Sequence, residues 1–167
     1  MVTEATFQML LIAAALLCSL VAGFLFAFAT VIMPGLKMLN DREFIRAFQV
    51  IDGVIQNNQP LFVAVWTGSI VTLVASVGLG WSQLDGVQRL LLILAALVYV
   101  FGVQVSTFAV NVPLNNQLQR LDVDITDKVA LRAARTTFEP RWNRWNRVRT
   151  PLASLTLALI VVLLFQM

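Results

Sequence analysis

Four long stretches of the chain contain no charged side chain, and short polar segments separate them. Residues 5–36, 53–84, 90–119 and 150–167 hold no Asp, Glu, Lys or Arg. A helix needs about 20 apolar residues to cross the roughly 30 Å hydrocarbon core of a bilayer. Each stretch supplies that number or nearly so. The pattern therefore predicts an all-α membrane protein, a bundle of four transmembrane helices that forms a single domain over residues 1–167.

Proline and glycine set the expected ends of these helices. Pro34-Gly35 is expected to end the first helix, and the segment 111–116 is expected to close the third. Pro140 should end a short helix that begins near Asp127, and Pro151 should kink the last span near the membrane surface. The predicted spans are residues 6–33, 60–80, 89–110 and 148–166.

The first connection carries the pattern of an amphipathic helix. Apolar residues recur there at helical spacing among charged ones, and Asn40 precedes them as a capping residue with Glu43 three positions later. This pattern predicts a helix that lies on the membrane surface or on the end of the bundle. The apolar positions are Phe44, Phe48, Ile51 and Ile55.

Basic residues are distributed very unevenly between the connections. Eleven of the twelve lie in the first and third connections or at their helix ends, and Arg89 alone lies in the second. Because cytoplasmic loops are enriched in Lys and Arg, both termini are expected outside the cytoplasm, in a bacterial inner membrane. The net charge of +3 is thus interpreted as a topology signal and a contact with membrane lipids, not as a nucleic-acid surface.

The chain contains no histidine, and Cys18 is its only cysteine. Histidine and cysteine pairs are the usual ligands of haem, zinc, copper and iron. We therefore expect neither a metal nor a cofactor, and no disulfide within the chain.

Small residues recur every fourth position on the first two predicted spans. Such rows let helix backbones approach closely in lipid, where apolar burial alone cannot drive association. They predict close helix packing, within the chain or in a homo-oligomer. On the third span Gln104 is expected to form a structural hydrogen bond to a neighbouring helix. The rows are Ala15, Ser19, Gly23 and Ala27, and Ala64, Gly68, Thr72, Ser76 and Gly80.

Polar side chains that can act on a ligand gather at the basic ends of the predicted helices. Asn111 and Asn115 flank Pro113, whose ring nitrogen has no hydrogen to donate. Further along, one helix face is expected to carry aromatic and guanidinium groups, and the adjacent face amides. The pattern predicts a site for a flat ligand with polar edges, or else an interfacial belt in which Trp and Arg contact headgroups. The aromatic face holds Trp142, Trp145 and Arg149, and the amide face Asn143, Asn146 and Thr150.

The same residues carry a family resemblance over nearly the whole chain. Met33-Pro34-Gly35-Leu36, Asn111-Val112-Pro113-Leu114-Asn115 and Trp142, Trp145-Asn146, Arg149-Thr150 occur in the order found in a family of small four-helix membrane proteins. This family includes the fungal and bacterial anthrone oxygenases. The resemblance implies oxidation of a polycyclic anthrone to a quinone by O₂ without metal or flavin. It marks Arg149 and Asn146 as candidate catalytic residues, and Asn111, Asn115, Trp142 and Trp145 as candidate substrate-binding residues.

Two hypotheses compete on this basis. The first is a cofactor-independent oxygenase, or a binding protein, for a lipophilic aromatic ligand. The second is a non-catalytic membrane module that packs with itself or with another membrane protein. Anthrone oxidation needs a base that removes a proton from carbon and donors that hold the resulting enolate. Arg149 and the asparagines can donate, whereas Glu139 is the nearest carboxylate and nothing in the sequence directs it toward a pocket.

Overall fold

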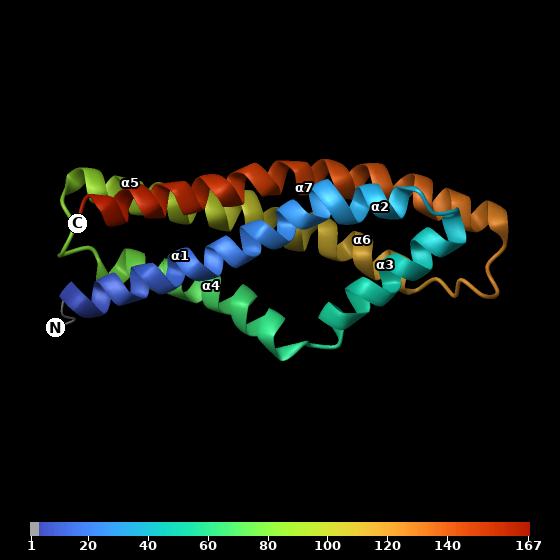
Figure 1. Ribbon diagram of the computed structural model, residues 1–167, viewed down its shortest axis with the longest axis horizontal. Coiled ribbons are helices and arrows are strands. Elements are labelled where there is room, and N and C mark those ends of the chain that lie inside the picture. Colours follow the sequence, from blue (N-terminus) through green and yellow to red (C-terminus); the bar gives the residue numbers. More distant parts are fainter. Residues whose placement is uncertain (1–3) are drawn as a thin grey trace.

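A computed structural model describes residues 4–167 of the chain, and this part is helical without any strand. Four helical stretches are long and apolar enough to cross a membrane: Glu4–Lys37, Pro60–Leu79, Gly86–Gln119 and Lys128–Phe165. The predicted all-α fold with four spans of a multi-pass membrane protein is confirmed. The first helical stretch begins and the last one ends at the same end of the elongated molecule, and the first and third connections lie toward the other end (Figure 1).

Two of the four spans combine α-helix with wider π-helical turns. The first consists of α1 (Glu4–Ala27), η1 (Phe28–Ile32) and α2 (Met33–Lys37), and the third of α5 (Gly86–Leu97), η2 (Val98–Val105), η3 (Thr107–Asn111) and α6 (Val112–Gln119). The others are α4 (Pro60–Leu79) and α7 (Lys128–Phe165), while α3 (Asp41–Gln56) lies in the first connection.

The predicted ends of the first and third helices are wrong, and the π turns give the physical reason. A proline ring clashes with the carbonyl four residues earlier and has no N–H to bond it. Here each helix widens just before its proline, so that Met33 N–H bonds Phe28 O and Val112 N–H bonds Thr107 O, five residues back. Local π adjustment of this kind is how membrane helices accommodate proline. Both helices therefore continue beyond their prolines.

The last span is a single 38-residue helix, which corrects the expected break at Pro140. It begins where predicted, because the Asp127 carboxylate accepts bonds from the backbone N–H groups of Val129 and Ala130 at 2.8 and 2.9 Å. Both Pro140 and Pro151 lie inside it. A 38-residue helix is about 57 Å long, well beyond the roughly 30 Å of a hydrocarbon core. Its charged first half therefore extends past the membrane-spanning half.

Helix α3 confirms the amphipathic prediction and packs on the ends of the other helices. Asn40 caps it by accepting a bond from Glu43 N–H at 3.0 Å. Its apolar face, with Phe44, Ile45 and Phe48 buried, packs against α6 and α7. The chain then turns through Asn58, which has a positive φ of 57°, a conformation that asparagine tolerates better than most residues. Helices α3 and α4 thus form a bent pair that faces α6 and α7 (Figure 1).

The small residues are used unevenly in packing. A Cβ added at Gly80 would lie 2.6 Å from the Phe7 ring, and one at Gly102 would lie 2.8 Å from Leu152. A Cβ at Gly68 would lie 3.1 Å from Leu17, whereas Gly23 has open space. The second row therefore does bring α4 close to α1, and the row on α1 is in part exposed.

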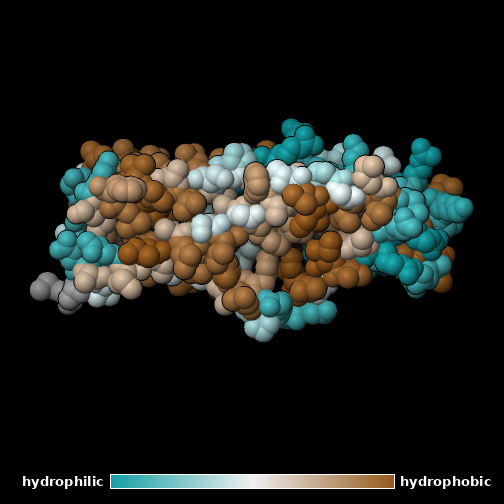
Figure 2. All heavy atoms as spheres, viewed as in Figure 1, coloured by the Kyte–Doolittle hydropathy of each residue, from teal (hydrophilic) through white to brown (hydrophobic). Residues whose placement is uncertain are grey.

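The side-chain oxygen of Gln104 finds its expected partner on a neighbouring helix, whereas its amide nitrogen is buried without a partner among the described residues. Trp66 Nε1 donates to Gln104 Oε1 at 2.9 Å, which confirms the predicted bond between helices. Figure 2 shows apolar side chains over much of the elongated surface, with polar residues most dense at the end formed by the first and third connections and smaller polar groups at the other end and along the edges between.

Candidate functional site

A cavity of about 440 Å³ lies between the α3–α4 pair and the helices η3, α6 and α7. Its volume falls within the roughly 300–1,000 Å³ of small-molecule sites. We call it the central cavity. Its polar lining residues are Asp52, Gln56, Asn58, Thr107, Asn111, Asn115, Asn116, Asn146 and Arg149, and its other lining residues are Phe24, Leu25, Phe28, Phe48, Ile55, Phe62, Trp66, Phe108, Val112 and Trp142.

Aromatic rings form one wall of the central cavity. Phe62 stacks on Trp66 with ring centroids 5.3 Å apart and an interplanar angle of 24°. Phe24 meets Phe62 edge-on at 5.3 Å, and Phe28 lies 5.5 Å from Trp142. Rings hold each other in offset and edge-to-face contacts of this kind. The wall is therefore rigid, apolar and suited to contact with another flat ring system.

The guanidinium of Arg149 lines the same cavity without an acidic partner among the described residues. The residue is only 3 % exposed. Its Nη1 donates to Thr107 Oγ1 at 2.8 Å and its Nη2 to Asn146 Oδ1 at 2.9 Å, while Nε has no partner in the described part of the chain. Taking an ion out of water costs several kcal/mol, and two neutral acceptors compensate only part of that cost. Arg149 is thus a buried cation with donor capacity to spare.

Asparagines on two elements orient this cation. Asn146 donates from Nδ2 to Leu25 O at 3.1 Å, which fixes its oxygen toward Arg149. With its amide turned to satisfy its neighbours, Asn111 places its oxygen 3.2 Å from Arg149 Nη2 and 3.3 Å from Trp142 Nε1. The hydrogen-bonding network assigns such amide orientations. Asn111 and Asn146 therefore direct carbonyl oxygens at the guanidinium.

Asp52 is the charged residue among the polar lining residues that the sequence analysis did not assign to the site; the others are Gln56, Asn58, Thr107 and Asn116. Asp52 lies on α3, is 4 % exposed and lines the central cavity. The side-chain amides of Gln56, Asn115 and Gln119 donate to its carboxylate at 2.6, 2.7 and 3.0 Å. One signal for its position was available, because Asp52 follows Phe48 by four residues and so belongs to the buried face of the amphipathic helix.

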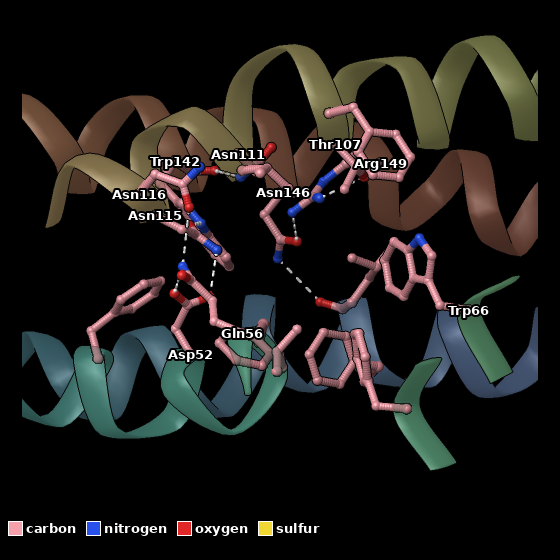
Figure 3. A pocket seen from close by; sticks show the side chains of 18 of the residues that line it. Asp52, Gln56, Trp66, Thr107, Asn111, Asn115, Asn116, Trp142, Asn146 and Arg149 are labelled. Carbon is pink, nitrogen blue, oxygen red and sulfur yellow. Dashed lines mark hydrogen bonds between the residues drawn. The ribbon is translucent and has the colours of Figure 1, made fainter. Parts of the chain in front are cut away.

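The predicted site residues come together with one exception. Asn111, Asn115, Trp142, Asn146 and Arg149 line the central cavity, and Figure 3 shows these five side chains, which come from η3, α6 and α7. Their functional roles stay predictions.

Trp145 does not line the cavity, although it lies half-buried on the same side of α7 as Trp142 and Arg149. The buried face of α7 instead runs through Trp142, Asn146 and Arg149, at spacings of four and three. Trp145 (i+3) and Asn146 (i+4) both lie on the same side of the helix as Trp142, and only contacts with other helices decide which of them faces the cavity.

Glu139 also lies outside the central cavity, and its carboxylate pairs with Arg135 at 2.9 Å. Across residues 4–167, His, Cys, Asp and Glu side chains nowhere gather in a group of three that would hold a metal ion.

Fold and cavity together define an all-helical, multi-pass membrane protein with an amide-rich, aromatic-lined interior site. Residues 50–160 match the anthrone oxygenase family, and the match includes every polar residue of the central cavity. The chain belongs to the anthrone oxygenase family. Neither a comparison with curated proteins nor one with solved structures gives a match.

Proposed function

We propose that this protein binds a flat, lipophilic anthrone-type molecule in the central cavity and oxidises it with O₂ to a quinone. The burial of Arg149 without an acidic partner among the described residues is the observation that supports this proposal most strongly. Arg149 is a buried cation with unused donor capacity, held by Thr107 and Asn146 in a cavity with an aromatic wall. A negatively charged oxygen on the ligand would supply the partner that the protein itself leaves out.

The chemistry of anthrones gives that oxygen. An anthrone is a three-ring ketone whose central ring carries a CH₂ group opposite the carbonyl. Loss of a proton from the CH₂ group turns the carbonyl oxygen into an enolate oxygen. Fixed donors in a water-poor site stabilise such developing charge most effectively. In this proposal Arg149 donates to the enolate oxygen, Asn111 and Asn146 hold the guanidinium in place, and no metal or flavin is needed for electron transfer to O₂.

A non-catalytic role in membrane assembly is the second candidate. The exposed part of the small-residue row on α1, around Gly23, offers a place where another helix can approach closely. A second copy of the chain is the simplest partner for it. This role is compatible with an oxygenase, and by itself it predicts no ligand in the central cavity.

We further propose that the end with the basic residues faces the cytoplasm. The first and third connections, which hold eleven of the twelve basic residues or lie beside them, are at the same end of the molecule. The central cavity would then lie at the cytoplasmic side of the bilayer, within reach of lipid-dissolved substrates.

The decisive experiment compares anthrone oxidation by the purified protein with that by Arg149 variants. We expect quinone formation above the buffer rate, unchanged by EDTA. Arg149→Ala should lower the rate by about 10²–10³, as loss of an oxyanion donor does. Arg149→Lys should be a poor substitute, because an ammonium group lacks the planar fork of donors.

Arg144→Ala is the matched control, since Arg144 is exposed on the same helix and lies outside the cavity. If the wild-type protein neither binds nor oxidises anthrone, the oxygenase proposal fails and the role in membrane assembly remains. An Arg149→Lys variant with normal binding and turnover would reduce Arg149 to a helix anchor.

A further inference from the structure

The central cavity contains a second buried charge, of opposite sign to Arg149. Asp52 lies on the α3 wall, and Figure 3 shows Arg149 on the facing α7 wall with Asn146 between them. In the described part of the chain Asp52 takes part in no ion pair: its bonds come from three neutral amides. The amides compensate the buried carboxylate without neutralising its negative charge.

Asp52 and Arg149 are both buried and line the same cavity, yet they form no ion pair with each other. Direct pairing of Asp52 with Arg149 would recover much of the cost of burying both. Each is instead held by its own set of neutral groups on its own wall. A ligand that lies between the walls and presents an acidic group to one ion and an acceptor to the other would satisfy both.

We infer that Asp52 is the general base of the proposed oxidation, the residue that removes the proton from the CH₂ carbon. This inference rests on the proposed function and deepens it. The acidic CH₂ group and the carbonyl of an anthrone lie on opposite edges of the central ring. A base and an oxyanion donor must therefore stand on opposite sides of the ligand, which is how Asp52 and Arg149 are arranged across the cavity.

The carboxylate of Asp52 keeps an acceptor position for this proton. Each carboxylate oxygen offers about two lone-pair positions. Gln56 and Gln119 both donate to Oδ2, whereas among residues 4–167 Asn115 alone donates to Oδ1. Asn115 is fixed in turn, because its own oxygen accepts from Trp142 Nε1 at 2.8 Å. Trp142 and Asn115 are thus positioning residues that hold Oδ1 with one lone pair free.

The reaction balances with O₂ as the only co-reactant. Asp52 takes one CH₂ proton, and the electron pair of that C–H bond passes through the ring to the carbonyl oxygen. The enolate gives one electron to O₂, and the substrate radical and superoxide combine in a C–O bond at the same carbon. The peroxide anion takes the proton back from Asp52. Asp52 then removes the second proton, the O–O bond breaks, and hydroxide leaves as a new carbonyl forms. Hydroxide and that proton give water, so anthrone and O₂ become quinone and water.

Deuterium exchange without O₂ isolates the first step. Anthrone is incubated with the full-length protein in deuterated buffer under argon, and deuterium at the CH₂ carbon is followed by NMR. We expect the wild-type protein to accelerate exchange over buffer. Asp52→Asn should lose that acceleration by about 10²–10⁴, the range for general base catalysis. Binding of anthraquinone, measured by tryptophan fluorescence quenching, should change by no more than a few-fold, because the side-chain shape is kept.

The control is Glu43→Gln, which removes an exposed carboxylate from the same helix and should leave exchange unchanged. If Asp52→Asn does not fold, Asp52→Glu takes its place. It keeps the charge but displaces it, and exchange should fall about tenfold or more at unchanged affinity.

The outcomes separate the two proposals. An Asp52 variant that binds anthraquinone and exchanges at the wild-type rate would overturn Asp52 as the base, while the oxygenase proposal would stand. Wild-type protein that forms quinone without accelerating exchange would do the same. Wild-type protein that neither binds anthraquinone nor oxidises anthrone would overturn the proposed function itself.

Discussion

Polar side chains behave differently in the two halves of this molecule. In the half formed by α1, α4, α5 and the end of α7, most hydroxyls bond a carbonyl of their own helix, as Thr72 does with Gly68 O at 2.7 Å and Thr156 with Leu152 O at 3.0 Å. In the half around the central cavity, amides, indole and ions bond across elements, as in the chain from Trp142 through Asn115 to Asp52.

The two kinds of hydrogen bonding have different structural consequences. Hydroxyls that bond their own helix satisfy themselves in lipid and impose no geometry on a neighbour. Bonds between elements fix side chains in space, and in the cavity they leave Arg149 and Asp52 with capacity for a further partner. The first half is a membrane scaffold, and the second is where the fold arranges polar groups around a space.

The cavity half is expected to lie at the cytoplasmic side of the bilayer, and the other half toward its external side. A reporter fused after Met167 tests this most sharply, because its signal is nearly all-or-none. Periplasmic alkaline phosphatase should be active there and a cytoplasmic fluorescent protein dark, as the uneven basic residues predict. The opposite result would place the central cavity at the external face.

Close packing should matter most in the scaffold half. Gly80→Leu should lower the stability of the detergent-solubilised protein by about 1–3 kcal/mol, because a Cβ there meets the Phe7 ring at 2.6 Å and Ser76 O at 2.8 Å. Gly78→Leu is the matched control, since Gly78 has open space around its Cβ position. Thermal aggregation measures both, and equal losses would show that these contacts do not govern packing.

Hydrogen bonding rather than packing should matter most in the cavity half. Trp142→Phe keeps an aromatic ring and removes the donor to Asn115. A loss of ~1.4 kcal/mol in the transition state would lower turnover about tenfold, with little change in thermal stability. Trp145→Phe, outside the cavity, should leave turnover unchanged. If both substitutions changed anthrone oxidation equally, the hydrogen bond from Trp142 to Asn115 would have no special role in turnover.

The sequence was most informative where composition alone decides structure. Charge-free stretches located all four spans, since a membrane-spanning helix needs about 20 predominantly apolar residues. Asn40 and Asp127 marked helix starts because local side-chain caps need no tertiary context.

Prediction failed where neighbouring helices decide. Pro34, Pro113 and Pro140 signal helix ends in isolation, but packing and wide turns carry the helices through them. Asp52 was not assigned to the site from the sequence, because only the approach of α6 brings Asn115 and Gln119 to its carboxylate. Trp145 and Asn146 are equally good neighbours of Trp142 on a helical wheel, and the helix packed opposite selects Asn146.

The π-helical turns have a consequence for how the two halves are joined. Each residue of an α-helix advances the side-chain direction by about 100°, and a π turn amounts to one extra residue in that winding. Along the third span, Tyr99, Val103, Thr107 and Asn111 are all buried at intervals of four through the widened region. The wide turns therefore keep residues spaced by four on the inward-facing side of the third span, from the lipid-embedded half to the cavity. Deleting a single residue between 98 and 111 would rotate Asn115 and its neighbours away from Asp52 while the membrane-embedded half stayed in register.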